Sequence, residues 1–234
     1  IGLPENGVGD IGVFTAINLG TNPIIANLSV TPTFESNGIS CIGPSIPFEI
    51  TVNPTAQVNE TNDIIVSNGD SVDIPFNTQN TGGITTYTWT NTDTTIGLSA
   101  SGSGDIGFTA VNMGTSPITT TIEVTPTFEN GGDSNTGQSD IYTITVNPTA
   151  QVDSITSQVL CNGDLTDAIG FTTQNTGGTT TYSWTNSNSS IGLISNGAGN
   201  IGSFVAENTS SITQVATIEV TPTFENGGDS NTGQ

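Results

Sequence analysis

The sequence contains no lysine, arginine or histidine, whereas it carries 21 aspartate and glutamate residues among 234. Soluble proteins normally carry charges of both signs on roughly a quarter of their residues. Because side-chain cations are missing, ordinary salt bridges are excluded, and no lysine or arginine can bind a phosphate group. Nucleic acids and anionic lipids are therefore unsuitable partners. The formal net charge of −21 favours solubility and mutual repulsion.

The same absences remove most catalytic groups. A serine or cysteine nucleophile normally needs an adjacent base, usually histidine. Phosphoryl transfer normally uses lysine or arginine as a charge clamp, and zinc sites of the histidine and cysteine type cannot be built from two cysteines alone. A carboxylate pair of the glycosidase type is the one chemistry left, but no two acids are marked out for it. We therefore expect neither enzymatic activity nor a bound cofactor.

Long apolar runs and helical periodicity are also missing. No segment reaches the 18 apolar residues typical of a membrane-spanning helix, so we expect no direct membrane insertion. Strand-like alternation is abundant instead. Thr85–Asn91 and Thr180–Asn186 alternate aromatic and polar residues, and Asn-Gly, Gly-Gly and Asn-Pro pairs occur about every ten residues. The chain is therefore predicted to be all-β.

The sequence repeats itself at a domain-sized period. Ile-Gly-Leu begins at residues 1, 96 and 191, a spacing of 95 each time. Repetition at a fixed period indicates an array of copies of one unit, and a unit of this size can bury its own core. We divide the chain into copy 1 (1–53, the C-terminal part of a unit), copy 2 (54–147, complete) and copy 3 (148–234, lacking its last strand).

Copy 2 is predicted to be an antiparallel β-sandwich of the immunoglobulin type, with a closed barrel as the alternative. The expected strands are Thr55–Asn59, Ile64–Val66, Asp73–Phe76, Thr85–Asn91, Ile96–Ser99, Gly107–Asn112, Thr119–Thr125 and Ile141–Asn147. The expected core residues are Phe76, Tyr87, Trp89, Phe108, Ile122, Val124, Ile144 and Val146.

The linkers between copies are short. Thr51–Thr55 and Thr145–Thr149 each carry one Asn-Pro pair, and proline restrains both itself and the residue before it. One strand therefore runs almost directly into the next copy. We expect a stiff rod rather than flexibly linked beads.

The two cysteines occupy different positions of the repeat. Cys161 corresponds to Ser67 of copy 2 and lies early in its copy, whereas Cys41 corresponds to Asn135 and lies late. In a rod they would be far beyond disulfide reach of each other. We expect each to pair with a partner outside residues 1–234, as an early-to-late staple within its own copy. Such pairing would indicate an oxidising compartment.

Calcium is the ligand to consider. The segment Glu129–Asp140 is rich in oxygen ligands and glycine, which suits a hard cation. The candidate ligands are Glu129, Asp133, Asn135 and Asp140. The alternative is a polar turn in which Asn, Asp and Gly serve the backbone, and this alternative is favoured because the spacing does not match an EF-hand loop.

A resemblance rests on motifs that recur in order: Ile144–Thr149, Leu160–Gly163, Tyr182–Asn186, Ile191–Leu193 and Val220–Thr223. Together they resemble the PKD-like, immunoglobulin-like tandem repeats of giant cell-surface proteins of Bacteroidota. The resemblance implies β-sandwich modules in secreted, type IX-exported adhesins, some of them linked to gliding motility. It also implies an extracellular location and O-glycosylation at Ser71, Thr94 and Ser154.

The expected function is that of a non-catalytic stalk or spacer in an extracellular adhesin or filament. Its partners would be the neighbouring modules of the same chain. Two alternatives stay open: a module that binds glycans or surfaces through its loops, and a subunit of a self-assembling filament or sheath. Near-identical copies favour the spacer, because a specialised binding site usually differs from its neighbours.

Overall fold

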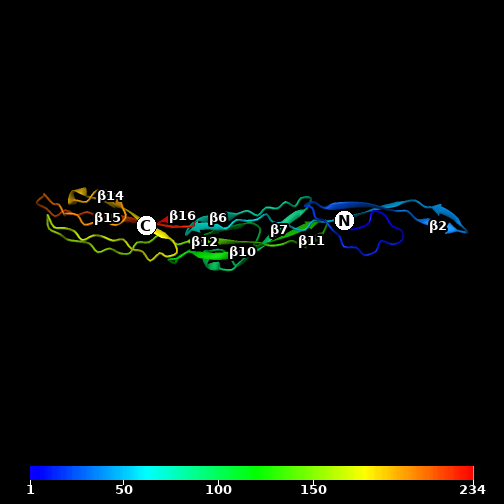
Figure 1. Ribbon diagram of the computed structural model, residues 1–234, viewed down its shortest axis with the longest axis horizontal. Coiled ribbons are helices and arrows are strands. Elements are labelled where there is room, and N and C mark those ends of the chain that lie inside the picture. The colour runs from blue at the N-terminus through cyan, green and yellow to red at the C-terminus, as the bar shows by residue number, and fades with distance from the viewer. Residues whose placement is uncertain (234) are drawn as a thin grey trace.

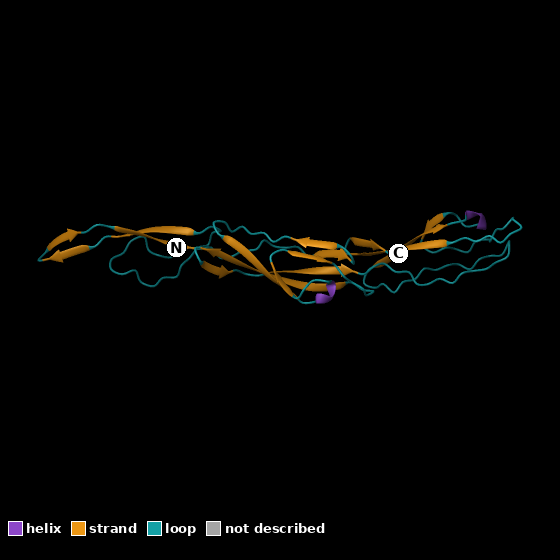
Figure 2. Ribbon diagram, turned by 180° about the vertical axis from the view of Figure 1, so that it is seen from behind, coloured by secondary structure: helices purple, strands orange, loops and turns teal. Residues whose placement is uncertain are grey.

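A computed structural model describes residues 1–233, and its strands follow one long axis (Figure 1). The repeated copies lie one after another along this axis, with β2 of copy 1 near one end and loops of copy 3 at the other. Both chain termini lie inside the rod rather than at its ends. Regular structure is β apart from two single-turn 3-10 helices (Figure 2).

Copy 1 consists of two antiparallel pairs. Strand β1 (Ile24–Val30) pairs with β4 (Ile46–Val52), and β2 (Thr33–Ser36) pairs with β3 (Ile39–Ile42). The two-residue turn between β2 and β3 places Asn37 and Gly38 at positive φ, which matches the right-handed twist of a hairpin. With no second sheet to cover them, many apolar side chains of this copy stay exposed.

Copy 2 contains two sheets. Its elements are β5 (Ile64–Ser67), β6 (Ser71–Ile74), β7 (Ile84–Asn91), η1 (Thr94–Ile96), β8 (Ser101–Ser103), β9 (Ile106–Thr109), β10 (Ile118–Asn130), β11 (Asp133–Thr136) and β12 (Asp140–Asn147). The larger sheet has the order β5-β12-β10-β7-β8, and β11 pairs with the far end of β10. The smaller sheet is the pair β6-β9. All pairs are antiparallel except β5 with β12.

The core of copy 2 lies between these two sheets. Alternation along β10 and β12 directs every second side chain inward, so that Ile122, Val124 and Ile144 are fully buried. The expected core is confirmed: six of its eight residues are buried, and Tyr87 and Phe108 pack against them half-buried. Tyr142 and Ile106 are core residues that the pattern did not predict.

Tryptophan packs over a glycine in the larger sheet of copy 2 and in the sheet of copy 3. Gly102 of β8 lies opposite Trp89, and a Cβ at Gly102 would fall 2.2 Å from the Trp89 ring. Gly197 and Trp184 repeat this arrangement in copy 3. The indole therefore covers the neighbouring strand, which explains why both tryptophans are nearly buried.

Copy 3 has a smaller set of strands and its own core. Its elements are β13 (Thr179–Asn186), η2 (Ser189–Ile191), β14 (Asn196–Ala198), β15 (Ile218–Asn226) and β16 (Asp229–Thr232), with sheet order β14-β13-β15-β16. Phe171, Trp184, Leu193 and Ile201 form its buried cluster. Among residues 148–233, no strand takes the place of β12. Of the two segments that flank this place, residues 158–161 form no strand, and 214–220 form one only from Ile218, where β15 begins.

The strand predictions fail at two places in copy 2. Thr55–Asn59 forms no strand, because its backbone bonds to side chains and loops instead of a ladder. Ile96–Ser99 follows the 3-10 turn η1, where the Asp93 carboxylate caps the Thr95 N–H group. The segment considered as a calcium-binding loop or a polar turn is the hairpin β10–β11, which turns at Gly131 and Gly132, as the favoured alternative predicts.

The hydroxyl of Tyr142 is buried in this core without a hydrogen-bond partner. Burial raises the pKa of Tyr142 from 10.0 to about 12. Because the unfolded state releases this proton first, the stabilising contribution of the neutral ring is complete below pH 10 and is lost as the pH rises towards 12. Tyr142→Phe should remove most of this alkaline sensitivity and stabilise the fold by about 1 kcal/mol at neutral pH.

Urea unfolding between pH 8 and 12 measures this effect. Tyr87→Phe is the matched control, since the half-buried Tyr87 should contribute less. Identical alkaline profiles for the wild-type chain and Tyr142→Phe would contradict the assignment.

Candidate functional site

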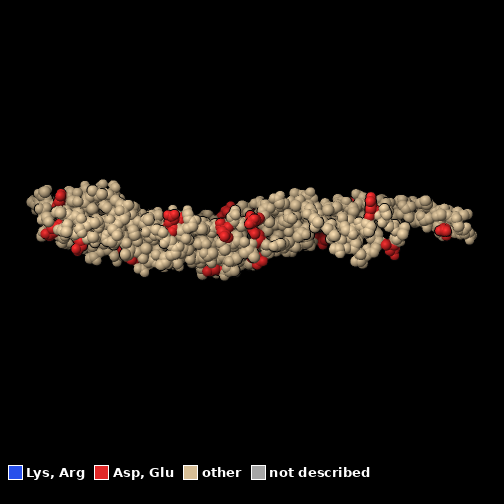
Figure 3. All heavy atoms as spheres, viewed as in Figure 1, with Lys and Arg blue, Asp and Glu red and all other residues tan. Residues whose placement is uncertain are grey.

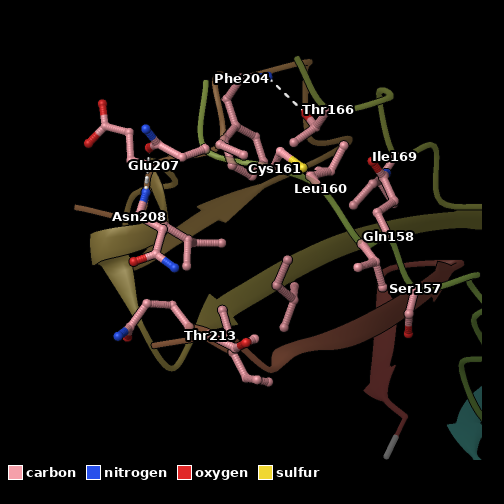
Figure 4. Close-up of a pocket in the computed structure, with 18 of the residues that line it drawn as sticks. Ser157, Gln158, Leu160, Cys161, Thr166, Ile169, Phe204, Glu207, Asn208 and Thr213 are labelled. Carbon is pink, nitrogen blue, oxygen red and sulfur yellow. Dashed lines mark hydrogen bonds between the residues drawn. The ribbon is translucent and has the colours of Figure 1, made fainter. Parts of the chain in front are cut away.

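A cavity of about 850 Å³ lies in copy 3. Two extended segments form its sides, residues 155–162 and 210–216, and core residues such as Ile201 and Phe204 form its floor (Figure 4). The lining mixes aliphatic side chains with nearly as many polar ones. It contains one carboxylate, Glu207, and no cluster of ionisable groups.

This cavity corresponds to the place of strand β12 in copy 2. There, β12 lies between β5 and β10. Residues Ile118–Val124 of β10 pair antiparallel with residues Asp140–Val146 of β12. The counterparts of β5 and of this part of β10 in copy 3 are residues 158–161 and 214–220, and they are the walls of the cavity. The cavity is therefore a strand-shaped groove that continues the sheet, not a pocket shaped for a small ligand.

The second candidate site is the junction between copies, where asparagine side chains join one copy to the next. Asn147, at the end of β12, is fully buried. Its amide donates to the Asn226 carbonyl at 3.2 Å, and the Asn226 amide donates back to Asn147 Oδ1 at 2.9 Å. Asn231 extends the clamp, because it donates to the Pro148 carbonyl at 2.7 Å and accepts from the Ala150 N–H group at 2.9 Å.

The junction between copies 1 and 2 repeats this geometry. Asn53 and Asn130 exchange the same pair of hydrogen bonds at 3.0 and 2.9 Å. Asn135 donates to the Pro54 carbonyl at 2.7 Å and accepts from the Ala56 N–H group at 2.9 Å. In both cases, a hairpin of the following copy reaches back over the Asn-Pro linker and satisfies its backbone groups.

A loop contact supports each junction at a further point. The Thr81 N–H group donates to the Thr21 carbonyl at 3.0 Å, and Thr176 donates to Thr115 at 2.8 Å in the next junction. Beside these bonds, Gly82 lies against Pro23, so closely that a Cβ there would fall 2.8 Å from the proline ring. Each junction is therefore held by the hairpin and by a separate loop.

One acid takes part in the junction between copies 2 and 3. Asp229 Oδ2 accepts hydrogen bonds from the Ser67 hydroxyl at 2.6 Å and from the Asn147 amide at 3.1 Å. Asn231 also donates to the Ser67 oxygen at 3.0 Å. Since the chain has no side-chain cations, hydroxyl and amide donors satisfy this carboxylate.

The structure does not gather the four calcium candidates into one site. Asn135 is engaged by the linker, and Asp140 accepts from the Thr61 N–H group at 2.8 Å. Glu129 and Asp133 are exposed on opposite strands of the β10–β11 hairpin. Among residues 1–233, no three histidine, cysteine or acidic side chains lie close enough to hold a metal ion.

Both cysteines are free and exposed. Their counterparts in copy 2 lie at opposite ends of that copy: Ser67 contacts copy 3, whereas Asn135 contacts the linker from copy 1. A disulfide requires Cα atoms less than about 7 Å apart, so these counterparts do not favour a staple within a single copy. The pairing of Cys41 and Cys161 with partners outside residues 1–234 stays a prediction.

Three carboxyl groups serve local structure, those of the exposed Asp63 and of the partly exposed Asp93 and Asp153. Hydrogen bonds lower the pKa of Asp63, through the Thr143 N–H group, and the pKa values of Asp93 and Asp153, through the hydroxyls of Thr95 and Thr172. These groups remain ionised acceptors at neutral pH. Acidic side chains are scattered along the face of the rod shown in Figure 3, without a concentrated patch.

The three residues expected to carry glycans, Ser71, Thr94 and Ser154, are exposed. Ser71 begins β6, Thr94 begins η1, and Ser154 precedes the groove of copy 3. Their modification stays a prediction, and an intact-mass measurement on protein from its natural source would test it.

Asparagine at the copy boundaries is the functional signal that the sequence predictions missed. The Asn-Pro pairs predict turns and short, restrained linkers, but they do not predict that Asn53 and Asn147 are the centres of the clamps. Within residues 1–233, no helix is long and apolar enough to cross a membrane. Comparison with known families and with curated proteins finds no family model and no curated protein that matches this chain.

Proposed function

We propose that this chain is a stalk region of a large extracellular bacterial surface protein, built from tandem immunoglobulin-like β-sandwiches. The observation that carries the proposal is the repeated junction. The two boundaries use the same asparagine pair and the same hairpin, with corresponding hydrogen-bond distances differing by no more than 0.2 Å. A joint that recurs with the copies sets a constant angle and spacing along the chain.

Rigidity follows from where the junction bonds lie. Each junction is fastened by the hairpin and also by the Thr21 or Thr115 loop, so bending the rod would break bonds at one of these contacts. The buried linker residues Ala56 and Ala150 leave little slack between copies. Support at separate points resists both bending and twisting, as a spacer requires.

The binding alternatives receive less support. Glycan-binding sites commonly present aromatic faces, but Trp89 and Trp184 are only 7% and 6% exposed. The cavity in copy 3 has the position of a strand, and acidic side chains lie along the whole length of the face shown in Figure 3. These features favour a spacer whose partners are its own neighbouring modules. Lateral association into a filament or sheath remains the second candidate, tested by the same scattering experiment.

Loosening one junction tests the spacer directly. Asn147→Ala combined with Asn226→Ala should weaken the joint by about 2 kcal/mol, because it removes three part-buried amide hydrogen bonds, one of them to Asp229. Small-angle X-ray scattering should then show a broader distribution of end-to-end lengths with a shorter mean. Asn27→Ala, at an exposed site within β1, is the control and should leave the profile unchanged.

A wild-type chain that is already bent in solution would contradict the spacer, as would a double variant with unchanged scattering. A scattering mass that rises with concentration would favour the filament. For localisation, antibodies against residues 54–147 should label intact cells of the source organism. Labelling that requires lysis would contradict an extracellular stalk.

A further inference from the structure

The two cysteines occupy positions whose counterparts touch across a junction. Cys41 pairs with Phe34 in the β2–β3 hairpin, as Asn231 pairs with Phe224 in β15–β16. The Cys161 N–H group donates to the Asp164 carboxylate at 2.8 Å, and Ser67 makes the same bond to Asp70 at 2.8 Å. Cys41 is thus the counterpart of Asn231, and Cys161 is the counterpart of Ser67.

Ser67 and Asn231 face each other from different copies. The Asn231 amide donates to the Ser67 hydroxyl oxygen at 3.0 Å, and Ser67 is only 4% exposed. The side chain at the end of β5 in one copy therefore meets the side chain on the returning hairpin of the following copy. Cys161 occupies the Ser67 position of this contact and Cys41 occupies the Asn231 position, but the two cysteines belong to different junctions.

We propose that these paired positions form a disulfide staple across a junction when both are cysteine. In an array, the Cys161 position of one copy would bond to the Cys41 position of the copy that follows. The bond forms by thiol–disulfide exchange with a small disulfide such as oxidised glutathione. One protein thiolate attacks it and releases one glutathione thiol; the second protein thiolate then displaces the other, leaving one protein S–S bond and two reduced glutathione molecules.

The staple replaces the asparagine clamp. Cysteine at the Asn231 position cannot donate to the Pro148 carbonyl or accept from the Ala150 N–H group. A covalent bond to the preceding copy would hold the hairpin in place of those hydrogen bonds. One array would then contain two kinds of junction, one held by asparagine hydrogen bonds and one held by a disulfide. This inference rests on the junction geometry and is independent of the stalk function.

The test uses the full chain with its own cysteines replaced, Cys41→Ser and Cys161→Ser. Into this background we introduce Ser67→Cys with Asn231→Cys. The control is Ser67→Cys with Asn135→Cys, which places the two thiols at opposite ends of copy 2. Each protein is folded under reducing conditions, checked by circular dichroism and tryptophan fluorescence, and then treated with oxidised glutathione.

The junction pair should form an intramolecular disulfide at least about tenfold more often than the control pair, since only the junction pair meets the distance requirement. Thiol titration and intact mass measure this, and cleavage with an acid-specific protease locates the bond. Free or glutathione-capped thiols in a folded junction variant would overturn the staple, as would equal bonding in the control.

If Asn231→Cys prevents folding, a second double-cysteine variant tests the same proposal. Ser67→Cys with Asp229→Cys uses the other close contact, because the two side chains hydrogen-bond at 2.6 Å. A disulfide in this pair supports the apposition of β5 and the hairpin. Failure of a folded protein to form it overturns the proposal.

Discussion

Extending the chain after Gln234 with a copy of Ser139–Asn147 should raise the thermal midpoint of copy 3 by roughly 10 °C or more. In copy 2, this segment supplies β12, whose Tyr142, Ile144 and Val146 side chains are buried between the sheets. Each such side chain contributes roughly 1.5–3 kcal/mol when it leaves water. The added strand would also give Gln214–Val220 a hydrogen-bonding partner, so the groove of about 850 Å³ would close.

Tryptophan fluorescence measures the gain in a Trp89→Phe background, where Trp184 reports on copy 3 alone. The matched control is the same extension with serine at the positions that copy Tyr142, Ile144 and Val146. It adds equal length without the apolar side chains and should leave the midpoint nearly unchanged. An equal rise with both extensions, or with neither, would show that the cavity is not the place of a missing strand.

Gly137→Ala should disturb the junction between copies 1 and 2 and destabilise it by about 1–3 kcal/mol, the usual range for overpacking. A Cβ at Gly137 would lie 1.8 Å from the carbonyl oxygen of Ala56 and 2.6 Å from its carbonyl carbon. Because the obstacle is backbone, no side-chain rotation relieves it. The hairpin must move away from the linker, which weakens the bonds between Asn135 and Ala56.

Hydrogen exchange at the Ala56 N–H group, together with urea unfolding, measures this loss. Gly107→Ala in β9 is the control, since its Cβ would meet nothing within 4 Å. Faster exchange at Ala56 in Gly137→Ala alone is the expected result. Unchanged protection there would mean that the hairpin does not hold the linker.

The alternating strands were predictable because their pattern is local. Thr85–Asn91 and Ile141–Asn147 alternate polar with apolar residues, and both match strands, β7 and β12, to within one residue at either end. Their inward side chains follow from a period of two, so most of the core could be listed in advance. The all-β class needed nothing more than these alternations and the absence of helical periodicity.

The failed predictions concern residues whose partners are distant in sequence. Thr55–Asn59 has strand-like composition, but Asn135, 79 residues from Ala56, takes its backbone hydrogen bond. Strand β10 continues through Pro126, where its other edge pairs with β7. On the edge that pairs with β12 and β11, the pairing with β12 ends at Val124 and the pairing with β11 starts at Thr127. Proline therefore falls where neither ladder needs its N–H group, which a local rule cannot detect.

The junction was hidden for the same reason. Asparagine before proline is common in turns, so Asn53 and Asn147 carried no mark of an interface. Their partners Asn130 and Asn226 lie 77 and 79 residues away. The repeat placed Cys41 and Cys161 correctly at different positions of the unit, but it could not show that these positions lie at opposite ends.

The position of the junction hairpin also sets the order in which such a chain can mature. The hairpin β10–β11 fastens to Asn53 and Pro54, which directly follow the final strand of the preceding copy. The hairpin of one unit can therefore dock only once the end of the preceding unit has been made, because its partners Asn53 and Pro54 lie there. Growth from the N-terminus, as occurs during synthesis or export, would then build the array one unit after another.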